Sequence, residues 1–363
     1  MIDWKYFKNF DWLMLFIVLI VSIMGILLIY SACYRNSNAK LYLSQILWLG
    51  CGLILVFIIA AIDYHSLAFI SLYFYLLTNL GLIYLLIFGR SIGGSKSWIK
   101  IAQFSLQPSE FAKIACILML AYYFSELQEV SLNFRHLFVP SLIVGLPFIL
   151  VLMQPDLGTA LTFIPIFFGI SFIAGVRWRT LLFLLIILLI IFSIGWFFFF
   201  KDYQRARLLS FFHPSENLQK DSYQSIQSKI AVGSGGLWGK GFLLGSQSHL
   251  RFVPAQHTDF IFSLLAEEFG LAGSVIFLIL YLSILLRSLG IATQASDRLG
   301  IFLVSGVISL LFFHLVINIG MIIGLMPIAG IPLPLISYGG SSLISFLIGI
   351  ALVINVRMRR FFA

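Results

Sequence analysis

Long apolar runs separated by short polar stretches dominate the chain. A helix needs about 20 predominantly apolar residues to cross a bilayer. Segments that approach or exceed this length lie at 12–31, 42–61, 67–88, 110–125, 137–153, 159–175, 180–200, 261–286, 299–323 and 342–356. The pattern predicts an all-α polytopic membrane protein with ten transmembrane helices.

Composition supports the same class of protein. The chain is 61% hydrophobic and 10% charged, whereas soluble domains average roughly 45–50% apolar and about 25% charged residues. The first apolar run continues to Tyr30 and is too long for a signal peptide, so we expect it to be retained as a helix. The cysteines, Cys33, Cys51 and Cys116, show no ligand spacing and predict neither a disulfide nor a metal site.

The distribution of positive charge predicts the orientation. If the N-terminus is cytoplasmic, the inner segments hold Lys5, Lys8, Arg135, Arg177, Arg179, Arg287, Arg298, Arg357, Arg359 and Arg360, and the short outer loops hold Arg35, Lys40, Arg90, Lys96 and Lys100. This bias favours two cytoplasmic termini. The longest loop, 201–259 between helices seven and eight, is then extracytoplasmic. Because this loop contains glycine-rich turns and few apolar residues, we expect it to be part of a single domain, 1–363, and not a separate fold.

The net charge is +9, but no basic run is long enough to indicate nucleic-acid binding. We expect it to reflect anchoring at anionic membrane lipid.

The unusual polar residues gather on the predicted outer side. In QPSEFAK (107–113), Glu110 and Lys113 are three apart and share a helix face. They form either an ion pair that stabilises the helix end or a cavity wall that contacts substrate. In QPDLGT (154–159), Asp156 is either a helix cap or a ligand for a cation or for sugar hydroxyls. The glycines around Lys240 form either plain tight turns or a backbone site for phosphate.

The stretch HTDFIFSLLAEEFG (257–270) places acids at the start of an apolar helix and inside it. Asp259 is either the N-cap of that helix or, beside His257, a general base at the membrane boundary. Glu267 and Glu268 lie deeper, and we expect at least one to bond to another helix. Further on, the prolines of 327–334 exclude a regular helix, so this apolar segment is predicted to be irregular and re-entrant.

Six strings occur in order along nearly the whole chain: SKSWI (95–99), QPSEFAK, QPDLGT, IQSKIAVGSGGLWGKG (226–241), HTDFIFSLLAEEFG and GIPLPLISYGGSS (330–342). Together they resemble the SEDS family (shape, elongation, division, sporulation) of bacterial peptidoglycan polymerases, and its elongation members more than its division members. The resemblance implies ten helices with both termini inside, in the bacterial cytoplasmic membrane. It also implies lipid II as substrate and a class B penicillin-binding protein, a transpeptidase, as partner.

The resemblance also assigns residues. The family's essential acid falls on Asp259, and further functional residues fall on Glu110, Lys113 and Asp156. The family usually has a glutamate where this chain has Ala255, so Asp259 is the main candidate base of its loop.

We therefore expect an inverting glycosyl transfer in which Asp259 takes the proton of the acceptor hydroxyl. Lys113, Lys240, Arg205 or a divalent cation (Mg or Mn) would stabilise the pyrophosphate leaving group. Asp156 or Glu110 would hold that cation or the sugar, with His257 and Ser341 as further substrate-binding residues. No organic cofactor is expected. The alternatives are a lipid II flippase, a division-type polymerase and a scaffold for other wall enzymes.

Overall fold

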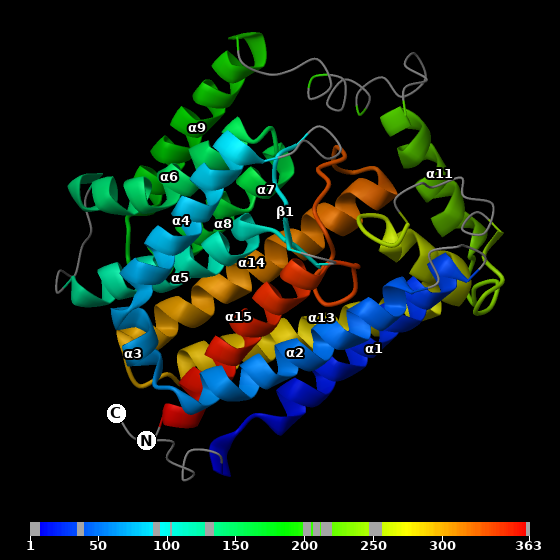
Figure 1. The fold of residues 1–363 in the computed structure, drawn as a ribbon, viewed down its shortest axis with the longest axis horizontal. Helices are drawn as coiled ribbons and strands as arrows, with labels where there is room; N and C mark the ends of the chain where they lie inside the picture. Colours follow the sequence, from blue (N-terminus) through cyan, green and yellow to red (C-terminus); the bar gives the residue numbers. More distant parts are fainter. Residues whose placement is uncertain are drawn as a thin grey trace.

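The computed structural model describes residues 8–34, 40–89, 95–101, 104–127, 134–198, 205, 211, 220–246 and 256–360. Within them the chain is mostly helical (Figure 1). The helices are α1 (Trp12–Cys33), α2 (Leu41–Ala61), α3 (Tyr64–Phe69), α4 (Ser71–Phe88), α5 (Pro108–Glu126), η2 (Phe134–Leu137), α6 (Phe138–Met153), α7 (Leu157–Leu161), α8 (Phe163–Ile173), α9 (Trp178–Phe198), α11 (Lys220–Ser234), α13 (Ile261–Thr293), α14 (Arg298–Ile323) and α15 (Gly340–Arg359). A short antiparallel hairpin pairs β1 (Ile99–Ile101) with β2 (Phe104–Leu106).

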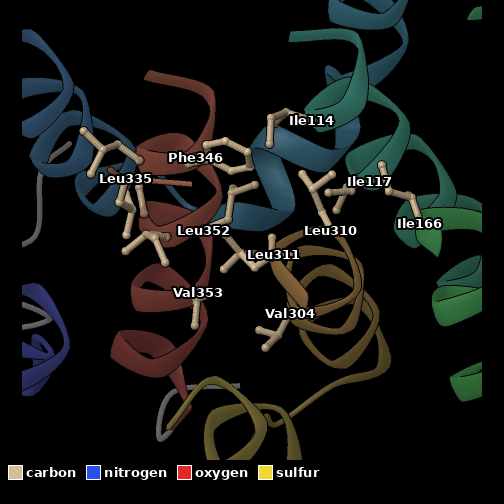
Figure 2. Close-up of a cluster of buried hydrophobic side chains, with 14 of the residues drawn as sticks. Ile114, Ile117, Ile166, Val304, Leu310, Leu311, Leu335, Phe346, Leu352 and Val353 are labelled. Atoms are coloured by element: carbon tan, nitrogen blue, oxygen red, sulfur yellow. The ribbon is translucent and has the colours of Figure 1, made fainter. Parts of the chain in front are cut away.

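The centre of the bundle is formed by α5, α14 and α15. Figure 2 shows Ile114 and Ile117 of α5, Leu310 and Leu311 of α14 and Phe346 of α15 in one buried cluster. Around this centre, α2, α4, α9 and α13 carry rows of exposed leucine, isoleucine and phenylalanine side chains. Large exposed apolar surfaces of this kind mark contact with a membrane or a partner.

Eight segments of the described chain are long and apolar enough to cross a membrane: Trp12–Cys33, Leu41–Ala61, Ser71–Phe88, Phe134–Met153, Trp178–Gly195, Ile261–Thr293, Arg298–Ile323 and Gly340–Arg359. The chain is therefore a multi-pass membrane protein. Two other predicted segments are helical but do not meet this criterion. One is α5, a largely buried helix that carries Glu110 and Lys113, and the other is the pair α7 and α8.

The segment 159–175 was predicted as one helix, and this is wrong in detail. The chain divides at Thr162, between α7 and α8. The cause is Pro165, which has no N–H to bond the carbonyl of Leu161 four residues earlier. The Thr162 hydroxyl instead donates to the Thr159 carbonyl at 2.6 Å.

Helix α13 differs from its predicted extent in two ways. It continues to Thr293 rather than ending near residue 286, and it kinks at Gly270. Gly270 has φ 66° and ψ −162°, a conformation that is essentially restricted to glycine. The kink separates a short segment, 261–269, which follows Asp259, from a long apolar segment, 271–293.

One end of the bundle is held together by a charged cluster. Asp11 caps α1 through the N–H of Met14 at 3.0 Å. It also accepts from Arg287 Nε of α13 at 2.7 and 2.8 Å and forms an ion pair with Arg357 of α15. Burial favours a raised pKa for Asp11, but these hydrogen bonds and charges lower its pKa below the usual value. The start of α1 and the end of α15 therefore lie at the same end of the molecule.

The segment 324–339 is irregular, as its prolines predicted. Helix α14 ends at Gly324 in the left-handed conformation, which glycine adopts without steric cost. The apolar side chains of Ile331, Leu333 and Ile336 that follow are buried against the bundle. This segment therefore packs inside the protein and can form the wall of a cavity.

The predicted long loop contains a helix that the sequence analysis did not anticipate. Helix α11 packs against α13 and α14 and lies at the edge of the bundle in Figure 1. The hydroxyl of Ser228 donates to the carbonyl of Ile322 at the end of α14, at 3.2 Å. This contact fixes α11 near the start of the irregular segment.

Candidate active site

A cavity of about 1220 Å³ opens between the irregular segment, the QPD turn, α2 and α9. Its polar wall includes Glu110, Asp156, His257, Thr258 and Asp259. Its apolar wall is formed mainly by α9 and includes Leu185, Leu188, Leu189, Ile191 and Ile194. A polar centre beside a long apolar wall suits a molecule that has both a hydrophilic head and a hydrocarbon tail.

Asp259 lies at the polar end of this cavity, in the turn before α13. The N-cap position of α13 belongs to Phe260, and no side chain caps this helix. The alternative in which Asp259 is the N-cap residue is therefore wrong. Its backbone carbonyl accepts from the side-chain amide of Asn318 at 2.8 Å. That bond fixes the backbone of Asp259 and leaves the side chain at the cavity wall.

Hydrogen bonds from the irregular segment hold the backbone of the HTD turn. The Tyr338 N–H donates to the His257 carbonyl at 2.9 Å, and the Ser337 hydroxyl donates to the Thr258 carbonyl at 2.7 Å. The side-chain amide of Asn318 also donates to the carbonyl of Ile331, at 2.7 Å. The HTD turn and the irregular segment, which are about 80 residues apart, thus form one rigid wall. Because the backbone carbonyls of the HTD turn are hydrogen-bonded, the position of Asp259 in this wall is fixed.

His257 belongs to the same wall and borders the cavity. Its imidazole lies 5.9 Å from the ring of Tyr338, measured between ring centroids. Burial lowers the pKa of His257 below its usual value. The lowered pKa favours the neutral imidazole, which offers one donor and one acceptor to a polar ligand.

Glu110 and Lys113 form the predicted ion pair, with Lys113 Nζ 2.8 Å from Glu110 Oε1. Glu110 borders the cavity, and its second oxygen accepts from the hydroxyl of Ser345 at 2.9 Å. Lys113 is fully buried behind the wall and has His314 Nε2 at 3.4 Å. His314 Nδ1 lies 3.0 Å from the carbonyl of Pro332, which requires a proton on Nδ1. Nε2 is then the acceptor that faces Lys113.

Asp156 is the N-cap of α7, one of the two predicted roles. One carboxylate oxygen accepts from the Thr159 N–H at 3.1 Å, and the other accepts from the Ser97 hydroxyl at 3.1 Å and from Gln107 Nε2 at 3.5 Å. Asp156 also borders the cavity. A Cβ at Gly158 would lie 1.9 Å from the carbonyl oxygen of Ala329, so glycine allows this turn to pack against the irregular segment.

Three other predicted residues lie away from the cavity wall. Ser341 is buried behind it, where its hydroxyl accepts from the Gln107 N–H at 3.0 Å and donates to the Ser105 carbonyl at 3.2 Å. Lys240 pairs with Glu267 at 2.8 Å on α13. Arg205 is half-buried and described without its chain neighbours. Ala255, where the family pattern has glutamate, is outside the described residues.

The two glutamates inside α13 have structural partners, as predicted. Glu268 accepts a hydrogen bond from the Ser31 hydroxyl of α1. Glu267 is held by Lys240 and by the hydroxyl of Ser246, at 3.4 Å. These contacts tie α13 to α1 and to the glycine-rich loop.

Within the described ranges, no three His, Cys, Asp or Glu side chains are grouped as metal ligands. The oxygens of Asp156 and Glu110, the two acids predicted to hold a cation, already accept hydrogen bonds from the protein. Because carboxylates that bind a metal commonly accept hydrogen bonds as well, the cation expected at these two acids stays a prediction.

Sequence reasoning missed His314, Asn318 and Ser345, which support the wall from behind. Each is a buried polar residue inside a predicted transmembrane segment. Polar side chains are energetically costly there, so these positions could have been selected from the sequence as residues with a specific role.

Several known proteins are similar to this chain over nearly its whole length. The chain matches the FtsW/RodA/SpoVE family, described as cell cycle proteins, over residues 11–361. Peptidoglycan glycosyltransferase RodA of Treponema pallidum (strain Nichols) is 36% identical over 429 residues, which covers 97% of this chain and 98% of that protein. Peptidoglycan glycosyltransferase MrdB of Escherichia coli (strain K12) is 35% identical over 352 residues, or 97% and 94% of the two chains.

Among solved structures, a chain of a peptidoglycan synthase complex superposes with a TM-score of 0.84 at 30% identity, over 98% of this chain and 99% of that one. The chain therefore belongs to the FtsW/RodA/SpoVE family, the SEDS family that its six motifs resemble.

Proposed function

We propose that this protein is a RodA-type peptidoglycan glycosyltransferase that polymerises lipid II for cell elongation. The observation that carries the proposal is the position of Asp259, on a rigid polar wall of a cavity that also has an apolar wall. The polar wall suits the sugar and pyrophosphate of a lipid-linked donor, and α9 suits its hydrocarbon tail. The peptidoglycan glycosyltransferases RodA and MrdB, at 36% and 35% identity, support the same activity.

The reaction is a single inverting displacement. The 4-hydroxyl oxygen of the acceptor sugar attacks the anomeric carbon of the donor, and the bond from that carbon to the pyrophosphate oxygen breaks. Asp259 accepts the hydroxyl proton, and undecaprenyl pyrophosphate leaves with the electron pair. General-base catalysis of this kind contributes about 10²–10⁴-fold to the rate. An α-linked donor gives a β-1,4 product.

The leaving pyrophosphate needs positive charge beside it in the transition state. Lys113 is engaged with Glu110 behind the wall, and Lys240 is engaged with Glu267 on α13. Both are therefore weaker candidates than the sequence suggested. A divalent cation held chiefly by the pyrophosphate itself is the proposed source of this charge, since Arg205 does not border the cavity either. His257, Asp156 and Glu110 border the cavity, and in this proposal they contact sugar hydroxyls there.

We further propose ten transmembrane segments in the bacterial cytoplasmic membrane: the eight long apolar helices, α5, and α7 with α8. Both termini would be cytoplasmic, in accord with the charge bias. The cavity and the loop 201–259 would then lie on the outer side of a single domain. A transpeptidase of the class B penicillin-binding type is the proposed partner, supported by the similarity to a chain of a peptidoglycan synthase complex.

The test is lipid II polymerisation by the purified protein, co-expressed with its transpeptidase. Wild type should make glycan, and a folded Asp259→Asn variant should not. Asp63→Asn is the matched control, since Asp63 lies beside Arg359 at the opposite end of α15 and should leave polymerisation unchanged. Glycan from the Asp259 variant at the wild-type rate would refute the assignment of the base. Transport of labelled lipid II without any glycan would favour the flippase.

A further inference from the structure

The kink at Gly270 interrupts the hydrogen bonding of α13. In a continuous helix, the N–H groups of Leu271 and Ala272 would bond to the carbonyls of Glu267 and Glu268, four residues earlier. Gly270 has non-helical φ and ψ, and these four backbone groups find other partners. Unsatisfied backbone groups are costly inside a membrane, so their new partners matter.

The glycine-rich loop 235–241 supplies all four partners. The bonds are Lys240 N–H to the Glu267 carbonyl (3.0 Å), Gly241 N–H to the Glu268 carbonyl (2.9 Å), Leu271 N–H to the Gly236 carbonyl (2.9 Å) and Ala272 N–H to the Leu237 carbonyl (3.0 Å). A Cβ at Gly239 would lie 2.2 Å from the Glu268 carbonyl oxygen, so close approach requires glycine. These N–H groups are used by α13 and do not form a phosphate site.

The same loop carries two large apolar side chains that point away from the protein. Trp238 is 83% exposed and Leu237 is 65% exposed. Leu271, directly bonded to the loop, begins a row of exposed apolar residues along α13 that continues through Ile276 and Ile279. The one charged residue of the loop, Lys240, is paired with Glu267. The exposed face of the loop thus continues the lipid-facing surface of α13 and adds no unpaired charge.

Two independent helix lengths place this loop at one membrane boundary. Along α13, Gly270 lies seventeen residues before Arg287, a rise of about 26 Å. Along α1, Ser31 lies twenty residues after Asp11, a rise of about 30 Å. Asp11 bonds Arg287 at one end, and Ser31 bonds Glu268 at the other. The hydrocarbon core is about 30 Å thick, so the kink and the charged cluster lie at opposite boundaries.

We propose that Leu237 and Trp238 insert into the headgroup region of the outer leaflet and anchor the glycine-rich loop there. Tryptophan is enriched at this boundary because its ring is apolar and its N–H is polar. The loop in turn stabilises the kink, and the short helical segment beyond the kink follows directly from Asp259. If Asp259 is the general base, as proposed above, the anchor sets the depth of its carboxylate relative to the lipid headgroups.

The test measures depth and does not depend on activity. Cys51 is the exposed native cysteine, whereas Cys33 and Cys116 are buried, so Cys51→Ala gives the background for labelling. Trp238→Cys is labelled with the fluorophore NBD in liposomes of phosphatidylglycerol and phosphatidylethanolamine. Ile276→Cys is the control inside the bilayer, and Lys100→Cys, exposed on β1, is the control in water. Quenching by aqueous iodide is compared with quenching by nitroxide lipids of two depths.

At position 238 we expect blue-shifted emission and iodide quenching severalfold weaker than at position 100. We also expect stronger quenching by a nitroxide near the headgroup than by one deep in the acyl chain, with the reverse order at position 276. Iodide quenching equal to that at position 100 would overturn the proposal. So would quenching by iodide that disappears only when the transpeptidase is added, because the loop would then be a protein-docking surface.

Discussion

Replacing Lys113 with methionine should destabilise the folded protein by about 3 kcal/mol, because the Glu110 carboxylate is left buried without its cation. Lys113 is fully buried, and its Nζ lies 2.8 Å from Glu110 Oε1. Removing one member of a buried ion pair costs about 3–5 kcal/mol. We expect the lower end of this range because Glu110 borders the cavity and keeps its hydrogen bond from Ser345.

The reverse change, Glu110→Gln, should cost more, about 5 kcal/mol. The ammonium of Lys113 would then keep only His314 Nε2 at 3.4 Å and the ring of Phe346, whose centroid lies 5.4 Å away. A desolvated cation–π contact stabilises by about 2 kcal/mol, which is less than the desolvation cost of a buried ammonium. The double variant Glu110→Gln/Lys113→Met buries no charge at this site and should recover most of the loss.

The free energies of unfolding are measured by titration with SDS in detergent micelles. Lys100→Met, at an exposed lysine on β1, is the matched control and should change stability by less than about 0.5 kcal/mol. If the losses of the two single variants simply add in the double variant, the coupling is absent and this reasoning is refuted. Polymerisation by the folded double variant then separates the roles. If the double variant is active, the role of the ion pair is structural. If it is folded but inactive, the charge of Glu110 is needed at the cavity wall for contact with the substrate.

Asp11 has a lowered pKa, so its stabilising contribution is present above the unfolded pKa of about 3.9 and is lost as pH falls through the folded value. The difference in melting temperature between wild type and Asp11→Asn should be constant from about pH 7 to 5 and narrow below about pH 4; a difference that grows on acidification would contradict this. Gly239→Ala should destabilise by more than about 1 kcal/mol, because φ is +80° and the Cβ meets a backbone carbonyl of α13. Gly233→Ala, where a Cβ meets nothing within 4 Å, is its control, and equal SDS midpoints would exclude the clash. Asn318→Ala should cost about 1–3 kcal/mol and lower the polymerisation rate, because the Asp259 carbonyl loses its donor; an unchanged rate would show that this bond does not position the acid.

The sequence by itself determined the features that depend on local chemistry. Long apolar runs predicted the spanning helices to within a few residues in most cases, since burial in lipid requires a minimum apolar length. The prolines of 327–334 predicted the irregular segment, because proline lacks an N–H and fixes φ. The position of Asp156 directly before a helix predicted a cap as one of two roles, and Asp156 does cap α7. Pro165 also indicated the break at Thr162, but the continuous apolar run 159–175 led to the prediction of a single helix.

Only the tertiary structure decided which polar residues meet. Glu110, Asp156 and Asp259 are far apart in the chain and line one cavity because α5, the QPD turn and the HTD turn pack around the segment 324–339. Lys113 and Lys240 look alike in sequence as phosphate ligands, yet Lys113 is paired with Glu110 and Lys240 with Glu267, and neither lysine lines the cavity. Such pairings depend on how distant helices pack, and no local pattern of polar and apolar residues encodes that packing.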